Sequence, residues 1–392
     1  MKLSQRVAQV LPSATLAMTA RAQALKAQGK DILALSAGEP DFNTPEPINA
    51  AAKAAIDAGQ TKYTPVAGTF ALRQAVAHWA STLYGQTYAP KQTIIGTGGK
   101  QILFNAICAL LDPGDEALFA SPYWVSYPDM IRFAGGVPTA VRATDGSFLP
   151  QADAIEKAIG PKTKLLILNS PSNPTGACYT RAELAAIAEV LRRHPDVFTI
   201  TDDIYSGLVY DDVFVSLAQV ASDLSDRILI ATGVSKTYAM TGWRIGFGIG
   251  PQKLIAAMTD LQGAATSGPC SIAQAAALQA ITGDEAPILA MRDAFKKRRD
   301  ALVAGLKSLP KLTVHSPAGA FYVFVGIEQL KPKHIASSDA LCEHLLETVN
   351  LALVPGSAFG DDDYVRLSFA CSEQTLQEAV RRLSEGLKLL GV

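Results

Sequence analysis

Four apolar, β-rich runs of this 392-residue sequence end in side chains that can do chemistry. Lys236 comes shortly after the run 227–231, Asp202 and Tyr205 follow 197–201, Asn173 follows 164–168, and Lys100 follows 92–96. An amine in a partly desolvated pocket beside other cations is a competent nucleophile toward an aldehyde and can form a Schiff base. A carboxylate can hold a proton on a pyridine nitrogen, so that the ring accepts electrons from a substrate carbanion. The plainer alternatives are a solvated strand end for the lysine and a turn or helix cap for the aspartate.

Other candidates could bind an anion or a flat ring. Gly99 and Lys100 open a predicted helix, and a glycine loop at a helix start exposes backbone N–H groups to an anion. Arg244 could give a phosphate a second, bidentate contact, or it could be a surface arginine. Trp124 could offer its face to a heteroaromatic ring, although core packing is the usual fate of a lone tryptophan.

Alternation along a strand decides which side chains share a face. Asp203 points away from Asp202 if the extended geometry continues, so only one of the two can serve the site. In the strand-like run 364–369 the apolar residues alternate with polar ones, so Arg366 projects from the face opposite to them. That face could be solvent, or it could look into the crevice, where the guanidinium would bind a substrate carboxylate.

The order of elements predicts how these residues meet. The middle of the chain alternates β-rich runs with helical stretches, which is typical of a mainly parallel sheet with helices on both faces. Ligands of open α/β sheets bind at the carboxyl ends of the strands, so the four strand ends predict one shared site. A long helical stretch and further strands follow residue 284, and a predicted helix over 13–28 can return to pack on them. We therefore predict an α/β fold with a large cofactor-binding domain, 46–284, and a smaller α+β domain, 1–45 with 285–392.

Composition narrows the class of protein. The 35 Lys and Arg against 36 Asp and Glu give a formal charge of −1, which favours a small-molecule partner over nucleic acid or a membrane surface. The basic segment 296–299 is the strongest nucleic-acid-like feature, but its side chains spread around a helix, so we expect a solvated helix face. Five scattered cysteines without a Cys-x-x-Cys pair indicate neither disulfides nor zinc and favour a reducing, cytoplasmic location. The scattered histidines predict no metal site, and no segment has the apolar length to cross a bilayer.

The ordered set of motifs resembles the class I pyridoxal-phosphate-dependent aminotransferases of fold type I over nearly the whole chain. The resemblance rests on Ser235-Lys236, the Gly-Trp-Arg-Ile-Gly segment 242–246, the Asn-Pro-Thr-Gly segment 173–176, the spacing of Asp202 and Tyr205, and Arg366. Within the family, residues 121–128 and 239–244 are most similar to a subgroup of bacterial aspartate aminotransferases. The resemblance implies a seven-stranded, mainly parallel sheet and a pyridoxal 5′-phosphate cofactor.

For the cofactor, the resemblance implies a role for each matching residue. Lys236 would hold the cofactor as a Schiff base and later move a proton between the substrate Cα and cofactor C4′. Asp202 would pair with the pyridine nitrogen, Asn173 and Tyr205 would contact the phenolic oxygen, and Trp124 would stack on the ring.

The cofactor phosphate would be bound by the backbone of Gly99 and Lys100, by Arg244, and by Tyr63 of a second subunit, since the family's sites lie at the interface of a homodimer. One departure is Gly233, which stands where many relatives carry a phosphate-binding serine. That contact would then be absent, or a water molecule or Ser235 would replace it.

The resemblance also implies the substrates, an amino acid and a 2-oxo acid. The α-carboxylate would be bound by Arg366, Asn173 and the Gly38 backbone, and a side-chain carboxylate by Lys100, Ser13 and Thr15. We therefore expect an aminotransferase that moves an amino group from L-aspartate to 2-oxoglutarate in two half-reactions through pyridoxamine phosphate. The alternatives are another amino donor (aromatic, alanine or branched-chain) and a non-catalytic ligand-binding protein on the same fold.

Overall fold

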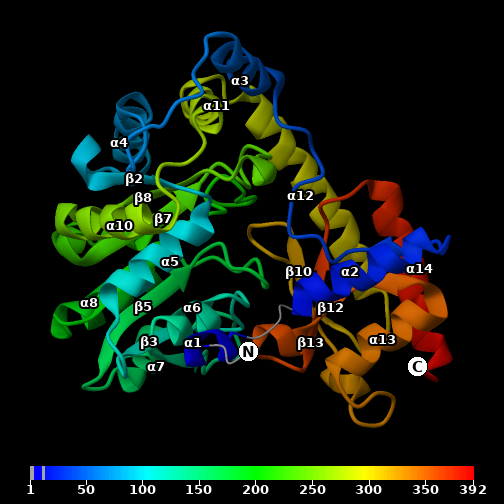
Figure 1. Ribbon diagram of the computed structural model, residues 1–392. Helices are drawn as coiled ribbons and strands as arrows, with labels where there is room; N and C mark the ends of the chain where they lie inside the picture. The colour runs from blue at the N-terminus through cyan, green and yellow to red at the C-terminus, as the bar shows by residue number, and fades with distance from the viewer. Residues whose placement is uncertain (1–3, 11–13) are drawn as a thin grey trace.

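The computed structural model describes residues 4–10 and 14–392, and a seven-stranded sheet lies at its centre (Figure 1). Six of its strands run in the same direction, and only β8 is antiparallel to its neighbours. This arrangement confirms the predicted mainly parallel sheet. In spatial order the strands are β2 (Thr93–Gly96), β8 (Gly246–Ile249), β7 (Ile228–Gly233), β6 (Phe198–Asp202), β5 (Thr163–Asn169), β3 (Glu116–Ser121) and β4 (Val137–Arg142).

Helices cover both faces of this sheet, which is why its strands read as nearly continuous apolar runs. Along β5, Leu165 and Ile167 pack on one face, while Leu166 and Leu168 pack on the other. The first face is covered by α5 (Gly99–Leu110), α6 (Tyr127–Phe133) and α10 (Gln252–Ala265). The second is covered by α3 (Glu46–Asp57), α4 (Phe70–Tyr84), α7 (Ala152–Ala158), α8 (Arg181–Arg193), α9 (Leu217–Val220) and α11 (Ser271–Thr282).

A smaller antiparallel sheet follows in the C-terminal part of the chain and packs against helices of its own. Its strands, in spatial order, are β12 (Val354–Pro355), β13 (Tyr364–Ser368), β10 (Tyr322–Gly326) and β9 (Thr313–Val314), and its helices are α12 (Ala286–Lys307), α13 (Ser338–Val349) and α14 (Glu373–Leu389). The described chain also contains short elements: α1 (Gln5–Ala8) and the 3₁₀ segments Pro90–Gln92, Ser222–Arg227, Thr241–Trp243, Glu328–Leu330 and Gly356–Phe359. Nowhere in residues 4–10 and 14–392 is a helix long and apolar enough to cross a membrane.

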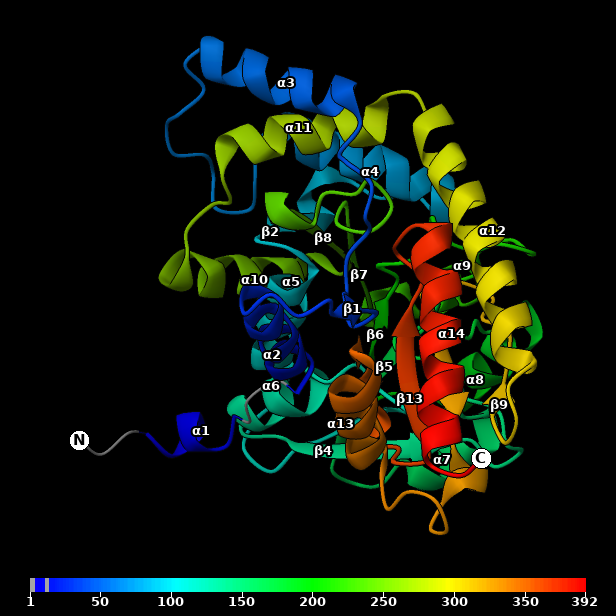
Figure 2. The same cartoon turned by 90° about the vertical axis from the view of Figure 1, so that its right-hand side faces the viewer.

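The N-terminal segment packs on this smaller sheet, as expected for a returning helix. The helix α2 (Ala14–Ala27) lies beside the C-terminal elements in both views (Figures 1 and 2), and Arg21 pairs with Glu343 and Glu347 of α13 at 3.1 Å. The strand β1 (Leu33–Ala34) pairs in parallel with β11 (Leu351–Ala352). The domain limits 45/46 and 284/285 stay a prediction.

The basic segment 296–299 of α12 is less exposed to solvent than we predicted. We expected a solvated face, but Arg299 is only 3% exposed and pairs with Asp211 at 2.5 Å. Lys296 pairs with the same carboxylate at 2.7 Å, and Arg298 pairs with Asp41 at 2.7 Å. The prediction of a solvated face is therefore wrong for the two arginines. Asp211 and Asp41 come from distant parts of the chain, and Arg299 also pairs with its neighbour Asp300 at 2.7 Å.

Candidate active site

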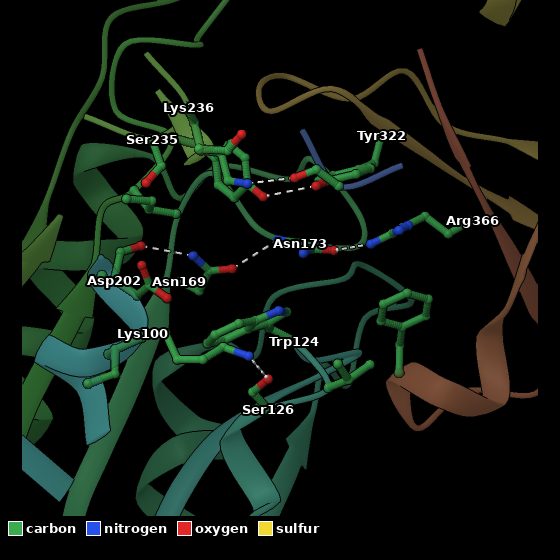
Figure 3. A pocket seen from close by; sticks show the side chains of 18 of the residues that line it. Lys100, Trp124, Ser126, Asn169, Asn173, Asp202, Ser235, Lys236, Tyr322 and Arg366 are labelled. Atoms are coloured by element: carbon green, nitrogen blue, oxygen red, sulfur yellow. Dashed lines mark hydrogen bonds between the residues drawn. The ribbon is translucent and has the colours of Figure 1, made fainter. Parts of the chain in front are cut away.

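The carboxyl ends of β5, β6 and β7 and the N-terminus of α5 open onto one cavity of about 290 Å³ (Figure 3). Tyr63 does not line it, and that residue is 99% exposed. Ser13 lies outside the described residues, as does the side chain of Thr15. The other predicted site residues do line the cavity: Gly38, Gly99, Lys100, Trp124, Asn173, Asp202, Tyr205, Ser235, Lys236, Arg244 and Arg366.

Lys236 reaches the cavity from the segment that follows β7. Its Nζ donates a hydrogen bond to the carbonyl oxygen of Gly38 at 2.5 Å. Burial lowers the pKa of this amine to about 8, with Arg244 and Arg366 acting in the same direction and Glu39 opposing them. About a tenth of Lys236 is therefore uncharged at pH 7, far more than for an ordinary lysine, and a nucleophile toward an aldehyde requires this uncharged form.

Asp202 is the last residue of β6 and is 5% exposed. Burial raises the pKa of its carboxyl to about 6, against the lowering effects of Tyr127, the Ile204 N–H group and Lys236. The Tyr127 hydroxyl donates to the Asp202 carboxylate at 2.6 Å. Asp203 does not line the cavity, in agreement with the alternation expected for a strand. The site thus holds a buried carboxylate that is mostly ionised at neutral pH and has no ion-pair partner among the described residues.

A cradle of backbone N–H groups and one arginine forms at the start of α5. Gly98 caps this helix with φ of 81°, and a Cβ there would lie 2.5 Å from the Arg244 guanidinium. A Cβ on Gly246 would lie 2.3 Å from the backbone of Gly98 and Gly99, so only glycines allow this close packing. A helix N-terminus with an arginine beside it is suited to a phosphate.

The glycine at position 233 has a steric explanation. A Cβ on Gly233 would lie 2.8 Å from the Cα of Gly246 and 2.8 Å from the Ile245 carbonyl oxygen. A serine would therefore need the neighbouring backbone to move. Ser235, two residues later, is buried and lines the cavity.

Arg366 is a buried cation, only 2% exposed. Its guanidinium donates to the Asn173 side-chain oxygen and to the Ser36 carbonyl oxygen, both at 3.0 Å, and neither partner is a carboxylate. Its Nε has no hydrogen-bond partner within the part of the chain that the structure describes. A buried cation without a counter-charge is costly, so this arrangement is suited to a ligand that brings a carboxylate.

Lys100 and Trp124 lie together on another wall of the cavity. The Lys100 Nζ donates to the Ser126 hydroxyl at 3.1 Å and lies 4.9 Å from the centre of the Trp124 ring. Burial lowers the pKa of Lys100, and Arg244 acts in the same direction. Lys100 and Arg366 therefore place cationic groups on different walls of the cavity, in addition to Lys236 and Arg244 (Figure 3).

Sequence reasoning missed several residues that complete the site. Asn169 directly follows the predicted run 164–168, so the same strand-end argument would have found it. Tyr322 lies on β10, and its hydroxyl meets that of Tyr205 at 3.0 Å. Tyr127 and Phe359 come from segments in which the sequence offers no signal of this kind.

The comparisons with known proteins agree with this geometry. A family model described as "Aminotransferase class I and II" matches residues 30–383, so the chain belongs to this family of aminotransferases.

Two curated relatives align over almost the whole chain. An aspartate/prephenate aminotransferase of Cereibacter sphaeroides is 48% identical and aligns over 97% of each chain, and one of Nitrosomonas europaea is 46% identical over 98% of this chain and 99% of its own. Among solved structures, the aspartate aminotransferase of Rhizobium meliloti has a TM-score of 0.95 at 42% identity and covers 99% of both chains. That of Thermus thermophilus with maleate has a TM-score of 0.94 at 43% identity, covering 98% of this chain and 100% of its own.

Proposed function

We propose that this aminotransferase uses pyridoxal 5′-phosphate to move the amino group of L-aspartate to 2-oxoglutarate in two half-reactions. The observation that carries the proposal is one cavity in which a partly buried amine, Lys236, and a buried carboxylate, Asp202, lie beside a helix N-terminus. These groups match the three parts of the cofactor that a protein must bind: an aldehyde, a ring nitrogen and a phosphate.

The charges of the cavity residues match those of the cofactor, because cationic and N–H groups are available for its phosphate and a carboxylate for its ring nitrogen. The phosphate would be held by the N–H groups of Gly99 and Lys100, with Ser235 and Arg244. The ring nitrogen would meet Asp202, the phenolic oxygen would meet Asn173 and Tyr205, and Trp124 would cover the ring face.

When bound, the cofactor supplies an aldehyde for amines and a ring that accepts the electron pair left at the substrate Cα. Lys236 would take the proton from the substrate Cα and deliver it to the cofactor, a role that requires the uncharged amine that its lowered pKa favours. Asp202 keeps a negative charge near the ring nitrogen and so holds a proton there. Replacing Lys236 with alanine should abolish both turnover and the absorbance of the Schiff base between protein and cofactor. Turnover in that variant without an added amine would contradict the assignment.

The preference for a dicarboxylic substrate is supported by the two cationic positions. Arg366, with Asn173 and the Gly38 backbone, would bind the α-carboxylate, and Lys100 would bind the side-chain carboxylate, with Ser13 and Thr15. The names of the relatives, aspartate or aspartate/prephenate aminotransferases, point to the same substrate class.

A donor panel tests this preference. With 2-oxoglutarate as acceptor, Lys100→Ala should lower kcat/KM for aspartate about 10- to 100-fold more than for alanine or phenylalanine, since one charge-assisted hydrogen bond is lost. Lys157→Ala, an exposed lysine of α7, is the matched control and should leave all donors unchanged. An equal loss for every donor would mean that Lys100 serves the phosphate alone. Because relatives are named for prephenate as well, prephenate belongs in the acceptor panel.

We further propose a homodimer in the cytoplasm with sites shared between subunits. Tyr63 is 99% exposed in the single chain and does not line that chain's own cavity, but it could reach the cofactor phosphate bound by a neighbouring copy. The five free cysteines support a reducing compartment. Tyr63→Phe should weaken cofactor affinity without changing the sedimentation coefficient. A fully active monomer at working concentration would contradict the role given to Tyr63.

A further inference from the structure

A buried tyrosine with no role in the proposed function lies between two residues that have one. Tyr322 is 0% exposed, begins β10 and lines the cavity. Its hydroxyl lies 3.0 Å from the Tyr205 hydroxyl, and the Arg366 guanidinium lies over its ring, 4.3 Å from the ring centre. Figure 3 shows Tyr322 and Arg366 on one side of the pocket, with Asp202 and Lys100 on the other.

The position of Tyr322 follows from the pairing of β10 with β13. Tyr322 pairs with Ser368, and Phe324 pairs with Arg366, so Tyr322 and Arg366 are diagonal neighbours on one face of the smaller sheet. Tyr205, by contrast, follows β6 of the seven-stranded sheet. The contact between the two hydroxyl groups therefore joins the two sheets at the wall of the site.

We propose that Tyr322 is a positioning residue that couples the carboxylate-binding Arg366 to the cofactor-facing Tyr205. Its ring supports the guanidinium, and its hydroxyl donates to Tyr205. A phenol has a single proton, so when Tyr322 donates, the Tyr205 proton is free to point into the cavity. A hydroxyl that accepts one hydrogen bond is also a better donor of the next, because the two bonds polarise each other.

The charged and titratable groups around Tyr322 agree with this arrangement. Burial raises the pKa of Tyr322, Arg366 and Tyr205 oppose that effect, and Glu39 adds to it. Burial likewise raises the pKa of Tyr205, with Tyr322 and Asp202 adding to the effect and Arg366 opposing it. Both phenols therefore remain protonated through the neutral range and are available as hydrogen-bond donors. A carboxylate that binds Arg366 offsets the charge beside Tyr322, which weakens Tyr322 as a donor to Tyr205.

The inference rests on the proposed function, and its test separates the two. The visible absorbance of the cofactor-loaded protein is titrated with pH, with and without saturating maleate, a dicarboxylic acid that carries no amino group to transfer. A wild-type protein that shows neither visible absorbance nor maleate binding overturns the proposed function itself. A wild-type protein that shows both allows the Tyr322 variants to be interpreted.

Tyr322→Phe removes only the hydroxyl. Without this hydroxyl, Tyr205 would donate less strongly to the phenolic oxygen of the cofactor. More negative charge would then stay on that oxygen, so the proton at the Lys236–cofactor linkage would be held more tightly. We expect the pH at the midpoint of the absorbance titration to rise by about half to one unit, the shift that one neutral hydrogen bond can produce. We also expect maleate to move the midpoint less than in wild type, with its Kd changed less than about twofold since the ring remains.

Tyr322→Leu also removes the ring beneath Arg366 and should weaken maleate binding about tenfold. The matched control is Tyr179→Phe, since Tyr179 is also buried, at 4% exposure, and donates to the Pro150 carbonyl oxygen at 3.0 Å, but does not line the cavity. A midpoint and a maleate response in Tyr322→Phe that equal those of wild type and of Tyr179→Phe would overturn the inference and leave Tyr322 a structural residue only.

Discussion

The hydrogen bond from Tyr127 to Asp202 offers a quantitative test of how the site keeps its carboxylate charged. The bond is 2.6 Å long, both residues are buried, and it opposes the effect of burial, which raises the Asp202 pKa to about 6. Tyr127→Phe deletes the donor and keeps the ring, which packs edge-on against Trp124 with ring centres 5.4 Å apart. The variant should therefore change the ionisation of Asp202 more than the shape of the cavity.

The size of the effect follows from the charge on the acceptor. A hydrogen bond to a charged group contributes about 1.5–3 kcal/mol, which corresponds to about one to two pKa units. The Asp202 pKa in the variant is then about 7 to 8, higher than in wild type because the charged form has lost a donor. If the cofactor binds only to the ionised carboxylate, its affinity should fall about 5- to 50-fold at pH 6 and less than about twofold at pH 9.

The assay is titration of cofactor-free protein with pyridoxal 5′-phosphate between pH 5 and 9. The informative quantity is the ratio of the two dissociation constants at each pH, because the titration of Lys236 is common to both proteins and cancels. A ratio that stays constant across this range would refute the reasoning, since it would mean that Tyr127 acts through packing and not through the charge of Asp202.

Two further predictions concern stability and the anion cradle. Burial raises the pKa of Asp203 to about 7, so its ionisation destabilises the fold as pH rises from about 4, where the unfolded carboxyl titrates, to about 7. Urea unfolding of the cofactor-free protein should therefore show that Asp203→Asn gains about 2–4 kcal/mol over wild type between pH 4 and pH 8, and parallel stability curves would contradict this. Gly246→Ala should cost about 1–3 kcal/mol of unfolding free energy and weaken cofactor binding, because its Cβ would meet the backbone of Gly98 and Gly99. Gly242→Ala, where a Cβ meets nothing within 4 Å, is its control, and equal behaviour of the two variants would disprove the steric argument.

Local patterns in the sequence predicted the strand ends well, because the physics that decides them is local. Burial on both faces makes the middle of β5 and the start of β7 continuous apolar runs, and polar residues begin where each strand ends. The rule that ligands lie at the carboxyl ends of parallel strands then predicted that Asp202, Lys236 and Asn173 lie close together, and all three line one cavity. Alternation left the direction of Arg366 open, and only the packing of the smaller sheet against the site turns it into the cavity.

Contacts between distant segments could not be predicted in this way. Tyr127 reaches Asp202 from a helix 75 residues earlier, and Tyr322 meets Tyr205 across 117 residues. The same limit explains the error at α12, because nothing near Arg299 in sequence indicates that Asp211 lies beside it. Pairings of this kind depend on how the two sheets pack together, which a one-dimensional pattern does not contain.

The most direct test of the account asks which amine carries the cofactor. The protein is loaded with pyridoxal 5′-phosphate, reduced with borohydride, digested, and examined by mass spectrometry for the peptide that holds the added group. We predict that the group is found on Lys236 alone and that Asp202→Ala lowers its yield at limiting cofactor. Modification of Lys100 in place of Lys236, or no modification of either, would contradict the claim that the Lys236 amine and the buried Asp202 carboxyl serve the same coenzyme.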